Sequence, residues 1–95
     1  MVRCQNALVV PKVSEFFGIA IYIYYDDHAP ALFHARYQGA WARVAIDALA
    51  VLDNDLTPRA LALVMEWAAP RLGELARAWD QASSHQEIDP IEPLR

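Results

Sequence analysis

The sequence has little of several features that would specify a function. Cys4 is the only cysteine, which excludes an internal disulfide and a cysteine metal cluster. The 8 basic residues are outnumbered by 12 acidic ones, and this balance argues against a nucleic-acid-binding protein, which needs a basic face for phosphates. No apolar run reaches the roughly 20 residues that cross a bilayer, and the N-terminus lacks the apolar segment of a signal peptide. We therefore expect a cytoplasmic protein with no membrane association.

The apolar content is sufficient for a folded core. Hydrophobic residues make up 56% of the chain, and its 95 residues allow one domain. We expect residues 1–9 to form an N-terminal extension, for which disorder is one option. Residues 10–87 are expected to form a single α+β domain, and residues 88–95 an extended tail, since prolines recur there.

Strand patterns dominate the first half of the chain. Residues 11–18 predict a short helical turn that Gly18 would end. Residues 19–25 are β-branched or aromatic except for Ala20, and their aliphatic side is expected to face the core. A hairpin turn is expected at 38–39, since glycine tolerates positive φ. Three to four antiparallel strands are thus predicted, at residues 19–25, 32–37, 41–47 and, as a short fourth, 49–52.

A long amphipathic helix follows the strands. Thr57 can cap its first amides and Pro58 suits its first position. We expect it to run over residues 58–82 with a kink near Pro70, at about Glu66-Trp67, or two helices meeting there, because Pro70 removes a backbone hydrogen bond. The predicted core stripe is Leu61, Met65, Ala68, Leu72, Leu75 and Trp79. The fold class is therefore α+β, a β-meander covered on one face by a C-terminal helix.

The candidate functional residues gather around the predicted turn after the first strand. They are Asp26, Asp27, His28, His34, Arg36 and Tyr37. The two histidines and Arg36 are the candidate catalytic groups, since histidine titrates near neutral pH. No metal-ligand spacing is present, so no metal site is predicted. A purely structural interpretation stays open, in which an aspartate caps the turn and His34 bonds a buried neighbour.

Two further features leave alternatives open. The tryptophans Trp41, Trp67 and Trp79 are expected to be core residues or interface anchors. The tail, residues 88–94, can either add as a strand to another chain's sheet or pack on its own domain.

Several segments together resemble a bacterial family catalogued as domain of unknown function 4160. They are the stretch from Val10 to Ile19, the run Tyr24-Tyr25-Asp26-Asp27-His28, the block Phe33-His34-Ala35, and Tyr37. The helix segments Arg59-Ala60-Leu61 and Glu66-Trp67 and the closing Ile91-Glu92-Pro93-Leu94 fit as well. The resemblance covers Val10 to Arg95 and implies a small bacterial cytoplasmic protein. Genes of this family often lie beside one for domain of unknown function 2442, a layout that resembles a toxin–antitoxin pair.

The chain departs from the family in its histidine motif. Where members typically read His-x-Pro-Pro-His-Phe-His, this chain reads His28-Ala29-Pro30-Ala31-Leu32-Phe33-His34. Leu32 takes the place of the middle histidine. A three-histidine site, if the family has one, is therefore incomplete here.

Our leading hypothesis is a non-enzymatic protein–protein interaction component of such a two-gene module. Its partner would be a small protein encoded by the adjacent gene, with a homo-oligomer as a further option and no cofactor. The contact would use an exposed strand edge, the hairpin from His28 to His34, or the tail. The rival is a metal-independent ribonuclease in which these histidines move protons, Arg36 binds phosphate, and Tyr22, Tyr24 or Tyr37 stack on bases. A small metal- or ligand-binding protein is the third interpretation.

Overall fold

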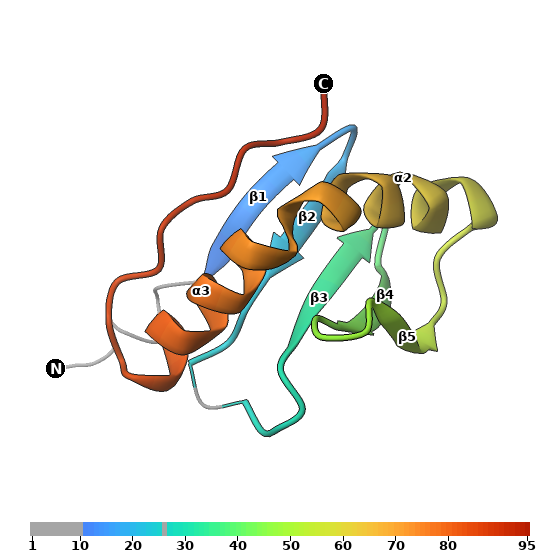
Figure 1. Ribbon diagram of the computed structural model, residues 1–95. Helices are drawn as coiled ribbons and strands as arrows, with labels where there is room; N and C mark the ends of the chain where they lie inside the picture. Colours follow the sequence, from blue (N-terminus) through green and yellow to red (C-terminus); the bar gives the residue numbers. More distant parts are fainter. Residues whose placement is uncertain (1–10, 26) are drawn as a thin grey trace, which may run out of the picture.

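The computed structural model describes residues 11–25 and 27–95, and in them one antiparallel sheet with helices on one face (Figure 1). The expected N-terminal extension, residues 1–9, and Asp26 lie outside the described residues. The five strands follow one another as a meander in the order β1-β2-β3-β4-β5. Their bounds are β1 Lys12–Phe16, β2 Ile19–Tyr22, β3 Leu32–Tyr37, β4 Ala40–Ala45 and β5 Ala50–Asn54. The α+β class is confirmed, whereas the expectation of three to four strands is wrong.

The additional strand is β1, where the sequence predicted a helical turn. Phe17 and Gly18 both have positive φ, 50° and 80°, and form a tight turn that folds β1 back onto β2. Gly18 therefore serves a hairpin turn, although its positive φ would also suit the end of a helix. An isolated helical turn is marginal in water, whereas pairing with β2 bonds the backbone and buries Val13 and Phe16.

The remaining strands follow the predicted pattern with shifted ends. β3 has the predicted bounds, and β4 and β5 lie within two residues of theirs. Gln38 and Gly39, with φ of 50° and 84°, form the predicted hairpin turn. β2 ends at Tyr22 rather than Tyr25, although Ile23 still donates its amide to the Pro11 carbonyl.

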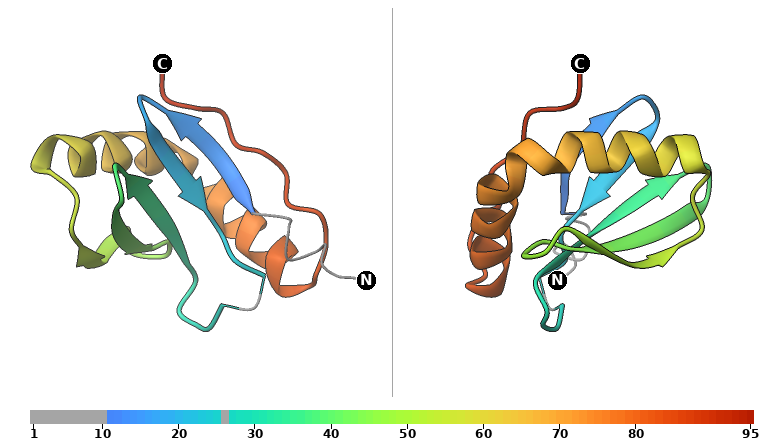
Figure 2. Two further views of the ribbon diagram at one scale, coloured as in Figure 1. Left: turned by 180° about the vertical axis from the view of Figure 1, so that it is seen from behind. Right: turned by 45° about the vertical axis from the view of Figure 1, so that its right-hand side comes forward.

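The predicted long helix is divided in three. Helix α2 spans Pro58–Ala68, a 3₁₀ segment η1 spans Ala69–Arg71, and helix α3 spans Leu72–Ser83. Thr57 caps α2 as predicted, since its hydroxyl accepts from the Ala60 amide at 3.1 Å. The break expected near Pro70 is present, at η1, which contains Pro70 and follows Glu66-Trp67 by a few residues. Figure 2 shows α2 and α3 bending where they meet.

The buried face of the helices differs from the predicted stripe. Its members are Ala60, Val64, Trp67, Ala68, Leu75, Ala78 and Ala82, so only two predicted positions, Ala68 and Leu75, are fully buried. Trp67 fills the core at 0% exposure, and the alanines on both helices permit close approach to the sheet. The other four predicted positions, Leu61, Met65, Leu72 and Trp79, are partly buried and pack against the core, so the predicted stripe lies beside the most buried line of side chains.

The tail packs on its own domain rather than extending away from it. Ile91 is 5% exposed and donates its amide to the Val13 carbonyl of β1 at 2.8 Å. The Trp67 indole donates to the Glu92 carbonyl at 2.7 Å, and Arg71 reaches the Pro93 carbonyl. Figure 1 shows the tail running beside β1. The outer side of β1 is therefore partly occupied by the chain itself.

Candidate binding face of the sheet

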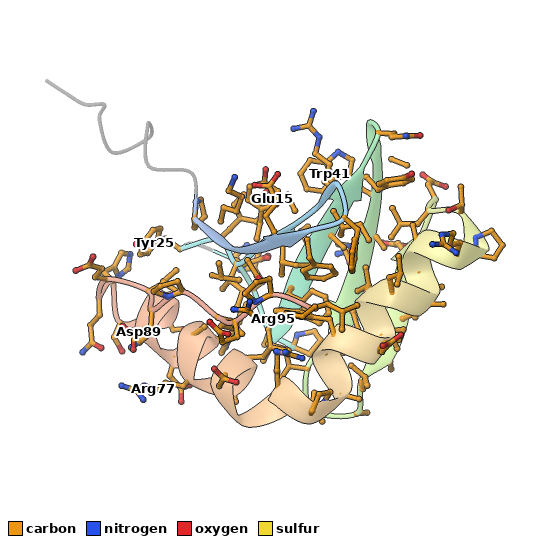
Figure 3. All side chains as sticks on the ribbon, turned by 90° about the horizontal axis from the view of Figure 1, so that it is seen from above. Glu15, Tyr25, Trp41, Arg77, Asp89 and Arg95 are labelled. Carbon is orange, nitrogen blue, oxygen red and sulfur yellow. The ribbon has the colours of Figure 1, made fainter. Side chains whose placement is uncertain are left out.

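One face of the sheet packs on the helices and the other is not covered by any described element. The aliphatic side of β2, with Ile19 and Ile21, faces the core as predicted, since both are 0% exposed. We call the opposite side the open face. The strand registers align its side chains in two rows, Lys12, Tyr22, His34, Arg43 and Asp53 in one and Glu15, Ala20, Arg36 and Trp41 in the other. Figure 3 shows Glu15 and Trp41 on the side away from the helices.

A bulge in β1 contributes to this arrangement. Lys12 pairs with Tyr22 and Ser14 pairs with Ile21, so one residue, Val13, is additional in β1. The insertion lets Lys12 and Glu15, three positions apart, lie on the same face. Their side chains form an ion pair of 2.6 Å there.

Four rings of the open face form an aromatic cluster, Tyr22, Tyr24, His34 and Trp41. The Tyr24 and His34 rings meet edge to face with centroids 4.6 Å apart, and Tyr22 and Trp41 lie 5.7 Å apart. Tyr22 also stacks on Tyr24, and His34 contacts Trp41. Such contacts add to area burial and fix the rings relative to one another. Trp41 is nevertheless 38% exposed, so the cluster presents a tryptophan to solvent.

The three cations of the open face differ in their partners. Lys12 is paired with Glu15, and Arg43 binds Asp53 through Nε and Nη2. Arg36 has no carboxylate partner among the described residues, and its guanidinium carbon lies 5.8 Å from the Trp41 ring centroid. Arg36 is thus the one cation of this face, within the described chain, whose charge is not already matched.

Asp27 and His34 meet at the edge of the aromatic cluster. His34 Nδ1 lies 3.9 Å from Asp27 Oδ2, too far for a hydrogen bond, and both atoms are buried without a partner. Burial lowers the pKa of His34 below its ordinary value of 6.5, an effect that Asp27 opposes and Arg43 reinforces. His34 is therefore a neutral, partly buried ring at neutral pH.

The structure brings only some of the predicted site residues together. His34 and Arg36 share the open face, and Asp27 joins them, while its Oδ1 accepts from the His28 amide as a turn cap. His28 itself is exposed, and no hydrogen bond, ion pair or ring contact links it to His34 within the described residues. Tyr37 pairs with Ile19 on the core side, away from the other candidates. Asp26 lies outside the described residues.

Sequence reasoning left two members of the open face out of the candidate site. Trp41 was expected to be a core or interface anchor, and Arg43 carried no assignment. The alternation of residues 41–47 was the available signal, since it places both on the side opposite the buried Val44. Their neighbours could not be found in this way because the cross-strand register joins positions far apart in sequence.

No group of three or more histidine, cysteine, aspartate or glutamate side chains able to hold a metal ion occurs in the described part of the chain. Leu32, which lies between His28 and His34 in the sequence, is 3% exposed and pairs with Ala45. A leucine buried in this way fills space beside the aromatic cluster.

In the part of the chain that the structure describes, no helix is long and apolar enough to cross a membrane.

The fold and this face define a small α+β protein whose antiparallel meander is covered by helices on one side and carries an aromatic cluster on the other. Comparison with protein families identifies its relatives. The model of the family described as Domain of unknown function (DUF4160) matches residues 18–80, and the chain belongs to this family. Comparison with curated proteins and with solved structures gives no match.

Proposed function

We propose that this chain is a non-enzymatic protein–protein interaction component of a two-gene, toxin–antitoxin-like module. Its partner would be the small protein encoded by the adjacent gene, and the open face would be the contact surface. The observation that carries this proposal is the aromatic cluster, with Trp41 38% exposed on a sheet face without cover in the described chain. Tryptophan, tyrosine and arginine are the residues that dominate binding energy in protein interfaces.

Two of the contact surfaces suggested by the sequence, the tail and an outer strand edge, are less suited to a partner. The tail is engaged on its own domain through Ile91 and Glu92, and it occupies a backbone acceptor of β1. The outer strand β5 pairs irregularly with β4, because their register shifts between Arg43 and Val44 of β4. Such a bulge hinders pairing with a further strand. The open face remains as the surface that is both exposed and rich in aromatic rings.

The charges of this face favour a protein over a nucleic acid. Lys12 and Arg43 are already neutralised by Glu15 and Asp53. A nucleic-acid surface needs several free cations to displace counterions from successive phosphates, and only Arg36 is free here. Tyr22 and Tyr24 lie on this face, but the ribonuclease alternative gains no support for its proton transfer, because no contact links His28 to His34 within the described residues.

The proposal is tested by co-expression with the adjacent-gene protein. We expect the two proteins to co-elute in size-exclusion chromatography, and Trp41→Ala to weaken the complex roughly 30-fold or more, as an interface hot spot does. Phe17→Asn is the matched control, because Phe17 is also an exposed aromatic residue, at 61%, but lies in the β1–β2 turn. Both variants should keep the unfolding midpoint of the wild type within a few degrees.

Two results would contradict the proposal. Failure of the wild-type proteins to associate would refute the assigned partner. An intact complex with Trp41→Ala would refute the open face as the contact surface.

A further inference from the structure

The aromatic cluster of the open face lies between two shallow hollows. One, of about 280 Å³, lies toward β1, with Ala20 among its lining residues and Arg36, Lys12 and Glu15 around it. The other, of about 470 Å³, lies toward β5 and is lined by Trp41 with Arg43, Asp53 and Asp55. The two hollows therefore differ in charge, since the first contains an unpaired cation and the second an excess of carboxylates.

The hollow toward β1 is open because Ala20 has a small side chain. Arg36 pairs across β2 with Ala20, which in turn pairs with Glu15 of β1. The methyl group of Ala20 leaves the β1 side of Arg36 uncovered, while Trp41, the pair of Arg36 on β4, supports the guanidinium from the other side. Stacking on an aromatic ring restricts the guanidinium, so less conformational entropy is lost when it forms hydrogen bonds.

The neighbouring carboxylate does not satisfy Arg36. Glu15 is the nearest acid across Ala20 in the register, but its Oε1 binds Lys12 at 2.6 Å. The guanidinium is exposed and has five donors in a planar fork that matches a carboxylate with two parallel hydrogen bonds. No described residue supplies that carboxylate.

From this arrangement we propose that the open face recognises a partner segment in which a glutamate or aspartate stands beside an apolar side chain. The carboxylate enters the hollow above Ala20 and binds Arg36, while the apolar group packs on Trp41. The acidic hollow toward β5 repels a carboxylate and thereby fixes the direction of the segment. This inference rests on the proposed function and specifies the chemistry of its partner.

The test compares Arg36 with an arginine outside the open face. With the adjacent-gene protein as the probe, Arg36→Gln is expected to weaken binding about 10- to 100-fold, the range for loss of a charge-assisted bidentate contact. A second arginine of this face, Arg43, already binds Asp53, so the matched control is taken from α3: Arg77→Gln should change affinity less than about threefold, because Arg77 pairs with Asp89 and lies outside the open face. Arg36→Lys keeps the charge but loses the planar fork of donors, so its loss of affinity should lie between those of the other two variants.

The salt dependence gives a second readout. The affinity of the wild type should decrease as the salt concentration is raised from 50 to 500 mM, and this decrease should be smaller for Arg36→Gln. If Trp41→Ala weakens binding but Arg36→Gln does not, the carboxylate inference is overturned while the proposed function stands. If Arg77→Gln weakens binding as much as Arg36→Gln, the assignment of the carboxylate to the hollow above Ala20 is overturned.

Discussion

The tail provides a sharp test of the fold, because Ile91 is its most deeply buried side chain. Ile91 is 5% exposed and packs in the core cluster with Val13 and Trp67. Replacing it with alanine removes three buried carbons, worth about 0.8 kcal/mol each, and leaves a cavity. We therefore expect Ile91→Ala to lower the free energy of unfolding by about 2–4 kcal/mol, a large share of the stability of a small domain.

The assay is urea denaturation followed by tryptophan fluorescence. Glu92→Ala is the matched control, because Glu92 is exposed and its interaction with Trp67 uses the backbone carbonyl, which the substitution keeps. We expect that control to change stability by less than about 0.5 kcal/mol. A loss below about 0.5 kcal/mol for Ile91→Ala would refute the docked tail. The outer side of β1 would then again be a candidate contact surface.

Two further predictions concern helix capping and pH. Thr57→Ala should cost about 1 kcal/mol of stability in the same denaturation assay, since the Ala60 amide loses its acceptor, whereas Thr57→Ser should be nearly neutral. His34 should titrate below 6.5 in an NMR pH series, because burial disfavours its charged form. Because burial lowers the pKa of His34 in the folded state, the unfolded chain binds the proton more readily. The contribution of neutral His34 to the free energy of unfolding is therefore complete above pH 6.5 and is lost as the pH falls through the folded pKa. As the pH falls from 6.5 through the folded pKa of His34, the His34→Gln variant should therefore lose less stability than the wild type. An equal loss would contradict the lowered pKa of His34.

Local signals were sufficient for part of the fold. The Gln38-Gly39 turn and the Thr57 cap depend on a few adjacent residues, and both were predicted correctly. β1 was not, because its stability comes from pairing with β2 and from packing by Ile91, which lies far along the chain. The helix stripe was predicted in part, since its members pack in or against the core but Val64 and Trp67 are the more deeply buried residues, and no local pattern indicates how the two helices turn at η1.

The candidate site was predictable only in outline. Strand alternation placed His34 and Arg36 on one face, and the structure agrees. Alternation also separated Tyr37 from them, although the sequence interpretation grouped all three by proximity in the chain. The contact of Arg36 with Trp41 and the ion pair of Arg43 with Asp53 depend on cross-strand register. A single sequence does not determine register when bulges are present, as they are in β1 and near Arg43.

The open face as the partner-binding surface is tested most directly by NMR with the adjacent-gene protein and a ¹⁵N-labelled chain. The three tryptophans give separate indole signals, which report on three surroundings. We predict that binding shifts the Trp41 indole and the amides of Tyr22, His34 and Arg36. The Trp67 indole, bound to the Glu92 carbonyl in the core, and the Trp79 indole on α3 should not move. Shifts confined to α3, the tail or β5, with the Trp41 signal unchanged, would contradict the account.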